Sequence, residues 1–260
     1  MPSPAPVSAP PANSSPEPQF AWQTCLDVKH RDAHIYDHHF NPALLEELAH
    51  PPRILLDIGC ASGLLCKAVK SGNPSCRTIG VEADEANAKL AAQNLDQVLC
   101  GKFEDINLES AGIALGSVDT VVAADVLEHM YDPWHVMTGL KPYLSKDAQI
   151  ILSIPNTRNL GLLKALLDDG RWTYTEIGLL DITHIRFFTL REIDAFLTQT
   201  GYRLEHVNFI IDPKFEQFCA QNMDKAEVNL RVGRISVERL TQKELAELCS
   251  WQFFIRARPV

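Results

Sequence analysis

From residue 53 onward, short apolar runs alternate with amphipathic stretches along the chain. The runs are too short for buried helices and predict strands at residues 53–58, 77–82, 97–100, 117–124 and 149–154. Helical periodicity predicts helices at residues 63–71, 84–95, 133–144 and 190–201. The last two strands are expected at 203–211 and 251–258. Because parallel strands need helical crossovers, this alternation predicts a doubly wound α/β fold. We expect a seven-stranded, mostly parallel sheet with an antiparallel final strand.

Two of these helices follow residues that commonly act as N-caps. Asp84 precedes the helix after the second strand, and Thr189 precedes the helix at 190–201. A side-chain oxygen at this position accepts a hydrogen bond from an unpaired amide of the first helical turn. We therefore expect both helices to begin at these residues.

Three other stretches do not follow the alternation. Residues 1–19 contain seven prolines and few apolar side chains, which predicts a disordered tail with polyproline-II character. Residues 20–52 are richer in apolar residues and predict an N-terminal helical cap over the ligand-binding end of the sheet. Within the α/β domain of residues 53–260, segment 156–189 is too long for a plain connection and is expected to be functional. Residues 213–248 are expected to form a helical insertion.

Composition narrows the classes of function. The 260 residues are 46% hydrophobic and 22% charged, as in an ordinary globular protein. The net charge of −9 disfavours broad electrostatic binding to nucleic acid or anionic membranes. No apolar run reaches the ~18 residues of a membrane span. The seven cysteines are odd in number and form no C-x-x-C motif, which predicts reduced thiols and a cytoplasmic location. Composition leaves the oligomeric state open.

The stretch around the end of the first strand carries the strongest ligand-binding signal. Asp57 ends an apolar strand, and the small residues Gly59, Cys60, Ala61 and Gly63 lead into a helix. Glycine lets a ligand approach the backbone closely, and ligands of such sheets bind outside the carboxyl ends of the strands. The spacing is neither that of a P-loop nor G-x-G-x-x-G, so it does not indicate phosphate binding.

A second acidic residue stands at the equivalent place on the next strand. Glu82 ends the strand at 77–82 and is followed by Ala83. In nucleoside-binding α/β folds a carboxylate here accepts hydrogen bonds from both ribose hydroxyls. A carboxylate that merely caps the following helix is the alternative, and Asp84 suits that role better.

Five motifs in register resemble class I S-adenosylmethionine-dependent methyltransferases over residues 50–160. They are D-x-G-x-A-x-G at 57–63, the acid at 82, the loop at 101–105, V-L-E-H-M-x-D-P at 126–133 and S-I-P-N at 153–156. Ala61 stands where that family usually has its middle glycine. Lys102 stands where it often has an acid for adenine, so Phe103 or Glu104 is expected to serve instead. The resemblance implies a Rossmann-like methyltransferase fold with S-adenosylmethionine as cofactor. It implies a cofactor site formed by Asp57, Gly59, Cys60, Ala61, Gly63, Glu82, Ala83, Phe103, Glu104, Ala124, Asp125 and Val126.

Segment 170–189 resembles part of bacterial methyltransferases that act on sugars or other small hydroxylated molecules. This implies methyl transfer to a hydroxyl of a small or glycan-like acceptor, covered by residues 156–189. Loss of the hydroxyl proton needs a general base, for which His184 is favoured and His129 is the rival. Asp181 is expected to orient the imidazole of His184. The acceptor-binding residues are expected to be Arg186, Arg171, Trp172, Tyr174 and Asn156.

Other functions stay open on the sequence alone. The acceptor atom could be nitrogen or carbon, or the acceptor a quinone-type phenol. A non-catalytic cofactor-binding module and a nicotinamide-dependent oxidoreductase are further alternatives. His30, His34 and His38 share one helical face at a spacing that could hold a metal. We interpret that face as polar surface and predict no metal site, and whether a divalent ion assists is left open.

Overall fold

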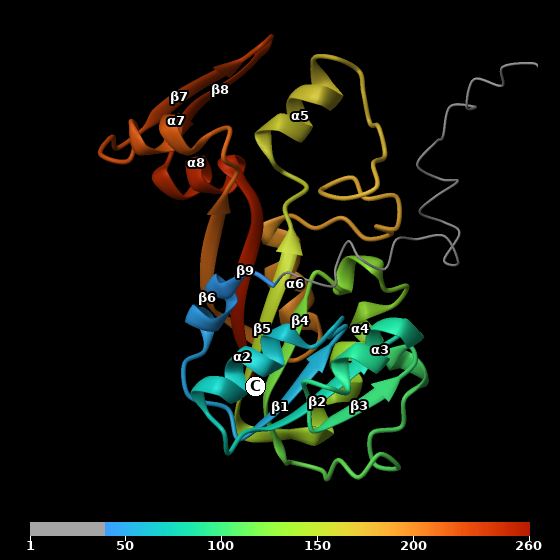
Figure 1. The fold of residues 1–260 in the computed structure, drawn as a ribbon. Coiled ribbons are helices and arrows are strands. Elements are labelled where there is room, and N and C mark those ends of the chain that lie inside the picture. The colour runs from blue at the N-terminus through green and yellow to red at the C-terminus, as the bar shows by residue number, and fades with distance from the viewer. Residues whose placement is uncertain (1–39) are drawn as a thin grey trace, which may run out of the picture.

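The computed structural model describes residues 40–260, and its centre is a seven-stranded sheet (Figure 1). The strands lie in the order β3-β2-β1-β4-β5-β9-β6. Their bounds are Ile54–Ile58 (β1), Arg77–Glu82 (β2), Gln97–Cys100 (β3), Val118–Ala124 (β4), Leu144–Pro155 (β5), Tyr202–Ile211 (β6) and Ser250–Pro259 (β9). The first five strands pair in parallel, and β9 runs antiparallel between β5 and β6. The predicted fold, including its antiparallel final strand, is confirmed.

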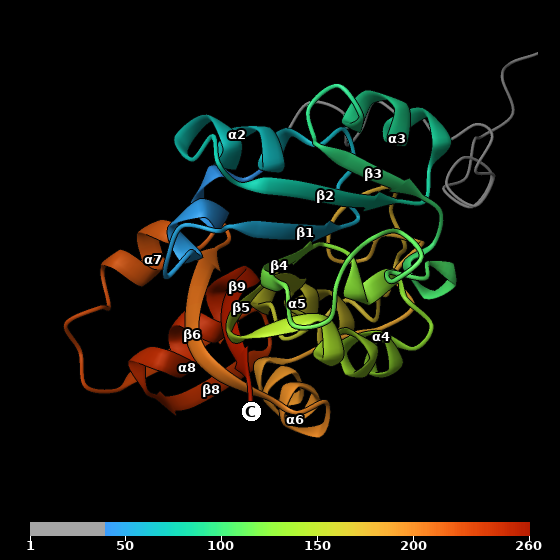
Figure 2. The same ribbon diagram turned by 90° about the horizontal axis from the view of Figure 1, so that it is seen from below.

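Helices cover both faces of this sheet (Figure 2). α2 (Leu64–Gly72) and α3 (Glu85–Ala91) lie on one face, and α4 (Pro133–Leu140) and α6 (Leu190–Gln199) lie on the other. The larger apolar core lies between the sheet, α4 and α6, and a smaller one lies between the sheet and α2. Within residues 40–260, no helix combines the length and the apolar character that crossing a membrane requires.

Both expected N-caps are present. The Asp84 carboxylate accepts a hydrogen bond from the Asn87 amide at 2.8 Å, and Thr189 Oγ1 accepts one from the Glu192 amide at 3.3 Å. Each bond satisfies an amide that has no partner within its helix. The starts of α3 and α6 are therefore set by single polar residues, as the sequence predicted.

The boundary between α4 and β5 differs from the prediction. α4 ends at Leu140 rather than at residue 144, because Pro142 lacks the amide hydrogen that an α-helix needs. The chain forms a 3-10 turn, η5 (Lys141–Tyr143), and β5 starts at Leu144. Leu144 pairs with Val118 of β4, which extends the strand toward its amino end.

The prediction of a helical insertion at residues 213–248 is wrong in its middle part. Short helices α7 (Glu216–Ala220) and α8 (Gln242–Cys249) flank a hairpin of β7 (Val228–Val232) and β8 (Ile235–Leu240). Apolar and polar residues alternate along both strands, and Gly233 takes a φ of 59° in the tight turn between them. The period of two was the signal for strands.

Several predictions concern residues outside the described range: the tail at 1–19, the face of His30, His34 and His38, and most of the cap at 20–52. The described part of that cap, residues 40–52, contains the 3-10 helix η2 (Pro42–Glu47). Leu44 of η2 packs into the core on the α2 face, and Arg256 Nη1 donates to the Glu47 carbonyl at 2.9 Å. This part lies against the face of the sheet rather than over the carboxyl ends of its strands.

Candidate active site

The turn after β1 is held in a conformation that small residues favour. Gly59, Ala61 and Gly63 have φ angles of 70°, 46° and 79°, in the left-handed region. The amides of Gly59 and of the next residue both donate to the Val81 carbonyl, at 2.8 and 3.1 Å. A Cβ on Gly59 would lie 2.5 Å from Val126 Cγ2. The turn is therefore fixed against β2 and against the end of β4.

Glu82 lies against this turn at the carboxyl end of β2. Its carboxylate accepts one hydrogen bond from the Ala61 amide and one from the Asp84 amide, each at 2.8 Å. Burial raises the pKa of Glu82, and these amide donors oppose the rise. A carboxylate has about four acceptor sites, so acceptor capacity is left for the hydroxyls of a ligand. The next residue, Ala83, is exposed at the same edge.

Asp57 lies buried at the end of β1, next to the turn. The Cys66 thiol donates a hydrogen bond to Asp57 Oδ2 at 3.4 Å. Burial raises the pKa of Asp57 to about 7; the Cys66 hydrogen bond opposes the rise and the negative charge of Glu82 adds to it. Two acids so close together favour a cationic ligand. Burial also raises the pKa of the Cys60 thiol, which disfavours its nucleophilic thiolate form.

Asp125 follows β4 in a backbone conformation that is uncommon for a residue with a side chain. Its φ is 56°, and such strain often occurs at functional sites. The Asp125 amide donates to the Ser153 carbonyl at 3.1 Å, and Ser153 Oγ donates to Asp125 Oδ1 at 2.7 Å. Desolvation raises the pKa of Asp125, which the Ser153 hydrogen bond and the charge of His184 oppose. Asp125 stands between Ala124, the last residue of β4, and Val126, which touches the β1 turn.

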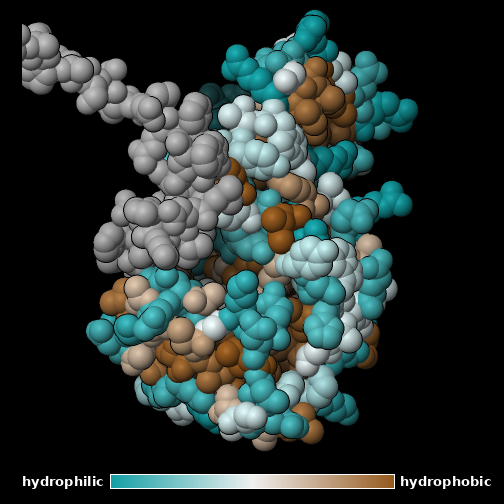
Figure 3. Space-filling view, turned by 90° about the vertical axis from the view of Figure 1, so that its right-hand side faces the viewer, coloured by the Kyte–Doolittle hydropathy of each residue, from teal (hydrophilic) through white to brown (hydrophobic). Residues whose placement is uncertain are grey.

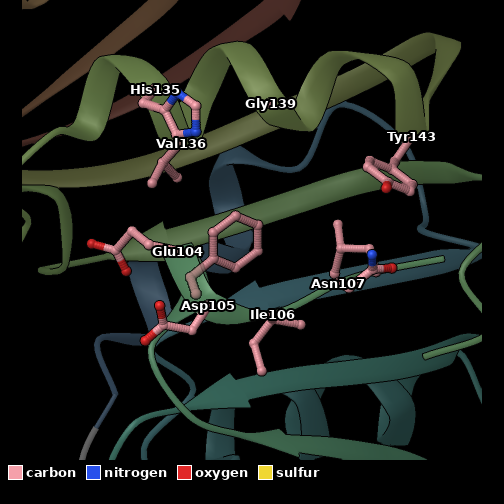
Figure 4. A pocket seen from close by; sticks show the side chains of 10 residues that line it. Glu104, Asp105, Ile106, Asn107, His135, Val136, Gly139 and Tyr143 are labelled. Atoms are coloured by element: carbon pink, nitrogen blue, oxygen red, sulfur yellow. The ribbon is translucent and has the colours of Figure 1, made fainter. Parts of the chain in front are cut away.

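A cavity of about 360 Å³ lies beside the loop after β3 (Figure 4). It is lined by the 3-10 turn η3 (Phe103–Asp105), the residues after it, and α4. In Figure 4 the carboxylates of Glu104 and Asp105 lie at one end and the Tyr143 ring at the other. Phe103 is half-buried against the main core and Glu104 is exposed. The residues expected beside adenine therefore border a hollow.

A buried polar cluster lies where β4 ends, between the 3-10 turn η4 (Leu127–His129) and the segment before α6. The rings of His129 and His184 meet edge to face, with centroids 4.7 Å apart. Glu128 Oε1 lies 4.0 Å from His184 Nε2. The amides of Ile185 and Arg186 both donate to the Glu128 carbonyl, at 2.9 and 3.0 Å. The two histidines predicted as rival bases are therefore neighbours in one site.

Glu128 belongs to this cluster; it lies within the motif at 126–133, but the sequence analysis predicted no role for it. It is 1% exposed, and within residues 40–260 neither of its carboxylate oxygens has a hydrogen-bond partner. Burial raises the pKa of Glu128 well above its usual range, and the negative charges of Asp125 and Asp181 add to the rise. The signal in the sequence was an acid placed directly between apolar Leu127 and His129.

Hydrogen bonds define which ring nitrogen of each histidine carries a proton. His184 Nδ1 lies 3.2 Å from the Leu179 carbonyl, which can only accept, so Nδ1 is the donor. Thr183 Oγ1 donates to Asp181 Oδ1 at 2.6 Å and therefore accepts from His129 Nδ1 at 3.0 Å. In the neutral form of either ring, the lone pair then lies on Nε2. Asp181, predicted to orient His184, orients His129 through Thr183 in this network.

The segment after α5 (Leu160–Leu167) runs beyond the carboxyl ends of β4 and β5 (Figure 1), and it carries aromatic and basic residues. The Arg186 guanidinium lies 5.2 Å from the centre of the Tyr131 ring and donates to the Tyr131 carbonyl. Trp172 packs edge-on against Phe187, with centroids 5.6 Å apart, and Tyr174 is exposed. Figure 3, which views the right-hand side of the molecule in Figure 1, shows apolar patches between polar ones. Arg186 and Trp172 thus each contact an exposed aromatic residue.

Two of the residues predicted to bind the methyl acceptor lie apart from these aromatic side chains. Asn156 is fully buried, and its side-chain amide donates to the Glu247 and Ser250 carbonyls at 2.6 and 3.0 Å. Asn156 Oδ1 accepts from the Arg158 amide at 2.9 Å. These bonds tie the end of β5 to α8 and β9, so this side chain stabilises the fold around the site. Arg171 is exposed just after α5.

The carboxyl ends of β1, β2 and β4, together with the segment of residues 168–189 beyond them, are called the crevice below. The fold and this crevice together define a class of protein. A sheet of this strand order, with a small-residue turn after β1 and an acid after β2, is the arrangement of class I S-adenosylmethionine-dependent methyltransferases. The profile of a methyltransferase-domain family matches residues 30–207, more than half of the chain. The chain therefore belongs to that methyltransferase family, and its cofactor is S-adenosylmethionine.

Curated relatives are similar over part of the chain. A ubiquinone biosynthesis O-methyltransferase of Psychrobacter arcticus is 25% identical over 187 residues, which cover 65% of this chain and 67% of that protein. A release factor glutamine methyltransferase of Fusobacterium nucleatum is 30% identical over 139 residues, covering 53% and 34% of the two chains. Across the curated relatives the alignments span 34% to 68% of the relatives' lengths.

Solved structures share the fold at low sequence identity. The plantazolicin methyltransferase BpumL was solved with a pentazolic desmethylPZN analog and S-adenosylhomocysteine (SAH). It superposes on this chain with a TM-score of 0.58 at 14% identity. The match covers 92% of this chain and 94% of that one. A SAM-dependent methyltransferase of Thermotoga maritima superposes with a TM-score of 0.54 at 16% identity, covering 84% and 86%. At such identities the likeness establishes the fold.

Proposed function

We propose that the chain transfers the methyl group of S-adenosylmethionine to a hydroxyl oxygen of a small or glycan-like acceptor. The observation that carries this proposal is the pair of neighbouring imidazoles, His129 and His184, close to Asp125 at the edge of the crevice. A hydroxyl must lose its proton during methylation, and a positioned base typically adds about 10²–10⁴-fold to the rate. A neutral imidazole whose Nδ1 is engaged by a carbonyl offers Nε2 for that proton.

The cofactor is held by the turn and by the acids around it. The backbone of residues 59–63 lies along the methionine part of the cofactor, and Glu82 accepts hydrogen bonds from the ribose hydroxyls. Asp57 and Asp125 place negative charge around a ligand that carries a positive sulfonium. Phe103 and Glu104 border the adenine, with Cys60, Ala83, Ala124 and Val126 completing the walls.

The transfer itself is an in-line displacement. The acceptor oxygen bonds to the methyl carbon while the carbon–sulfur bond breaks, and the electron pair of that bond stays on sulfur. The hydroxyl proton moves to His184 Nε2. Alignment of oxygen, carbon and sulfur accounts for roughly 7–11 kcal/mol of rate enhancement in favourable cases. His129, held by Thr183 and Asp181, forms the neighbouring wall of the acceptor position.

Two observations support a hydroxylated acceptor with a ring-shaped body. Trp172, Tyr174 and Phe187 offer aromatic faces in the segment that carries His184, and such faces suit ring-shaped ligands. The relative from P. arcticus is named for an O-methyl transfer. A quinone-type phenol satisfies the same chemistry and is the nearest alternative acceptor. Arg186 and Arg171 are proposed to hold polar groups of the acceptor.

Cell location and partners are part of the same proposal. The net charge of −9 supports a small-molecule acceptor rather than nucleic acid. The six cysteines within residues 40–260 are free thiols, which supports a reducing, cytoplasmic location.

Product analysis by mass spectrometry tests the proposed reaction. The full chain is incubated with methyl-labelled S-adenosylmethionine and with panels of sugars, phenols and amines. We expect the label on oxygen in a hydroxylated product, together with an equal amount of SAH. Label on nitrogen or carbon would contradict the acceptor assignment. Cofactor uptake by calorimetry with no product in any panel would indicate a binding module.

A further inference from the structure

A buried acid without hydrogen bonds marks the polar cluster at the end of β4. Glu128 is 1% exposed, and within residues 40–260 no donor or acceptor hydrogen-bonds to its carboxylate oxygens. Moving a carboxylate out of water is unfavourable unless donors or a cation replace the water. The neighbouring acids Asp125 and Asp181 add repulsion. A bound cation would remove this cost.

The two histidines beside Glu128 complete a set of ligand atoms. One atom from each of Glu128, His129 and His184 lies within 4.8 Å of the other two. Zinc bonds to nitrogen and oxygen are about 2.0–2.2 Å long, which places neighbouring ligands of a tetrahedral site about 3.4 Å apart. Binding of an ion therefore requires the ligand atoms to move closer together by up to about 1.4 Å.

Hydrogen bonds behind both rings match those of metal-binding histidines. His184 Nδ1 donates to the Leu179 carbonyl at 3.2 Å. His129 Nδ1 donates to Thr183 Oγ1 at 3.0 Å, and the Asp181 carboxylate accepts from that hydroxyl at 2.6 Å. A histidine that binds a metal almost always donates its other ring N–H to a carbonyl, carboxylate or water. Both rings are therefore in the tautomer that presents Nε2 as a ligand.

We infer that Glu128, His129 and His184 bind one divalent metal ion of the zinc class. Two imidazoles and one carboxylate with a further open position form a ligand set of catalytic zinc sites, whereas Mg²⁺ takes oxygen ligands.

The chemical role of the ion rests on the proposed function: its open position receives the acceptor hydroxyl. The ion favours the deprotonated form of that hydroxyl. Its proton passes to solvent water, and the bound oxygen then attacks the methyl carbon as the carbon–sulfur bond breaks. In the metal-bound site both imidazoles are ligands, so this route replaces proton transfer to His184.

Metal titration of the full chain tests the inference with a readout that is independent of turnover. The protein is stripped with a chelator and titrated with Zn²⁺ by calorimetry and with Co²⁺ by visible absorption, which reports the ligand geometry. We expect one ion per chain, bound at least about 100-fold more weakly by Glu128→Gln and by His184→Ala, since loss of even an outer partner costs about 10–100-fold. His50→Gln, a histidine hydrogen-bonded to the Asp147 carbonyl, is the matched control and should bind as the wild type does.

Calorimetry with SAH on the same samples separates this inference from the proposed function. Variants that keep their SAH affinity are folded around the crevice, so a selective loss of Zn²⁺ supports the site. Absence of stoichiometric Zn²⁺ binding by the wild type overturns the inference whatever the variants do, and leaves the proposed methyl transfer standing. Binding that survives both substitutions, or that is lost when His30, His34 and His38 are all changed to Gln, also overturns it. Zn²⁺ uptake without SAH uptake supports the site and contradicts the proposed function.

Discussion

The two halves of the crevice are built by different means. The cofactor half consists of a tight turn and two strand-end acids, held by backbone amides that donate to Val81 and Glu82. The acceptor half consists of buried side chains from η4 and from a segment far along the chain, joined by amides that donate to the Glu128 carbonyl. The first half depends on backbone shape and the second on buried charge and on the protonation of side chains. Substitutions in each half should therefore give separable effects.

The largest effect is expected from the buried acid of the cofactor half. The pKa of Asp57 is raised from 3.8 to about 7, so the folded protein binds that proton more tightly than the unfolded chain does. Stability from this group is complete below about pH 4 and is lost as the pH rises to about 7. Asp57→Asn does not undergo this loss, so its stability relative to wild type should grow by about 3 kcal/mol between pH 4 and 7. Urea unfolding over that range measures it, and a constant difference would contradict the burial of a charge at β1.

The second-largest effect is expected on the affinity for the cofactor when Glu82 is substituted. Glu82→Gln removes the charge that accepts from the Ala61 amide and from the ribose. Hydrogen bonds to charged groups contribute about 1.5–3 kcal/mol, so SAH should bind roughly 10–100-fold more weakly. Glu85→Gln alters an exposed i,i+4 pair with Lys89 and serves as the control. Equal affinities of the two variants in calorimetry would remove Glu82 from the cofactor site.

A matched pair of glycines separates steric fit from backbone strain. Gly63 and Gly112 have φ angles of 79° and 76°. A Cβ on Gly63 would overlap the Leu95 side chain, whereas nothing lies within 4 Å of one on Gly112. The left-handed conformation should destabilise both alanine variants by about 1–2 kcal/mol. Overpacking should destabilise Gly63→Ala by about 1–3 kcal/mol more. Equal stabilities in urea would mean that the turn is not packed as described.

The smallest effect is expected from a hydroxyl that supports His129 in the acceptor half. Thr183→Val removes the hydroxyl between Asp181 and His129. The loss of about 0.5–1.5 kcal/mol should lower kcat roughly fivefold and leave SAH affinity unchanged. Thr175→Val removes a hydroxyl that donates to the Ile177 carbonyl in the same segment and is the control. A fall in SAH affinity with Thr183→Val would show that the two halves are not separable.

The same division explains what could be predicted from sequence. The strands, the turn and the position of Glu82 could be predicted because each depends on residues near in the chain. The grouping of His129 with His184 could not, because it depends on how residues 168–189 return to the end of β4, a path with little regular structure. The role of Asp181 was missed for the same reason, since Thr183 stands between it and His129.

The hairpin β7–β8 was missed because its strands are short. Its strands have five and six residues, and a period of two over so few positions competes poorly with the helical signal of α8 next to it. Glu128 was passed over because an isolated acid in an apolar run gives no sign of whether it is buried. Only its surroundings in three dimensions show that its oxygens are unpaired within residues 40–260.

The most direct test of the central claim measures two quantities on one variant, His184→Gln. If His184 belongs to the acceptor half alone, SAH should bind within about twofold of wild type while kcat for methyl transfer to a hydroxylated acceptor falls by about 10²–10⁴-fold. Unchanged turnover would contradict the account, and so would a parallel loss of SAH affinity.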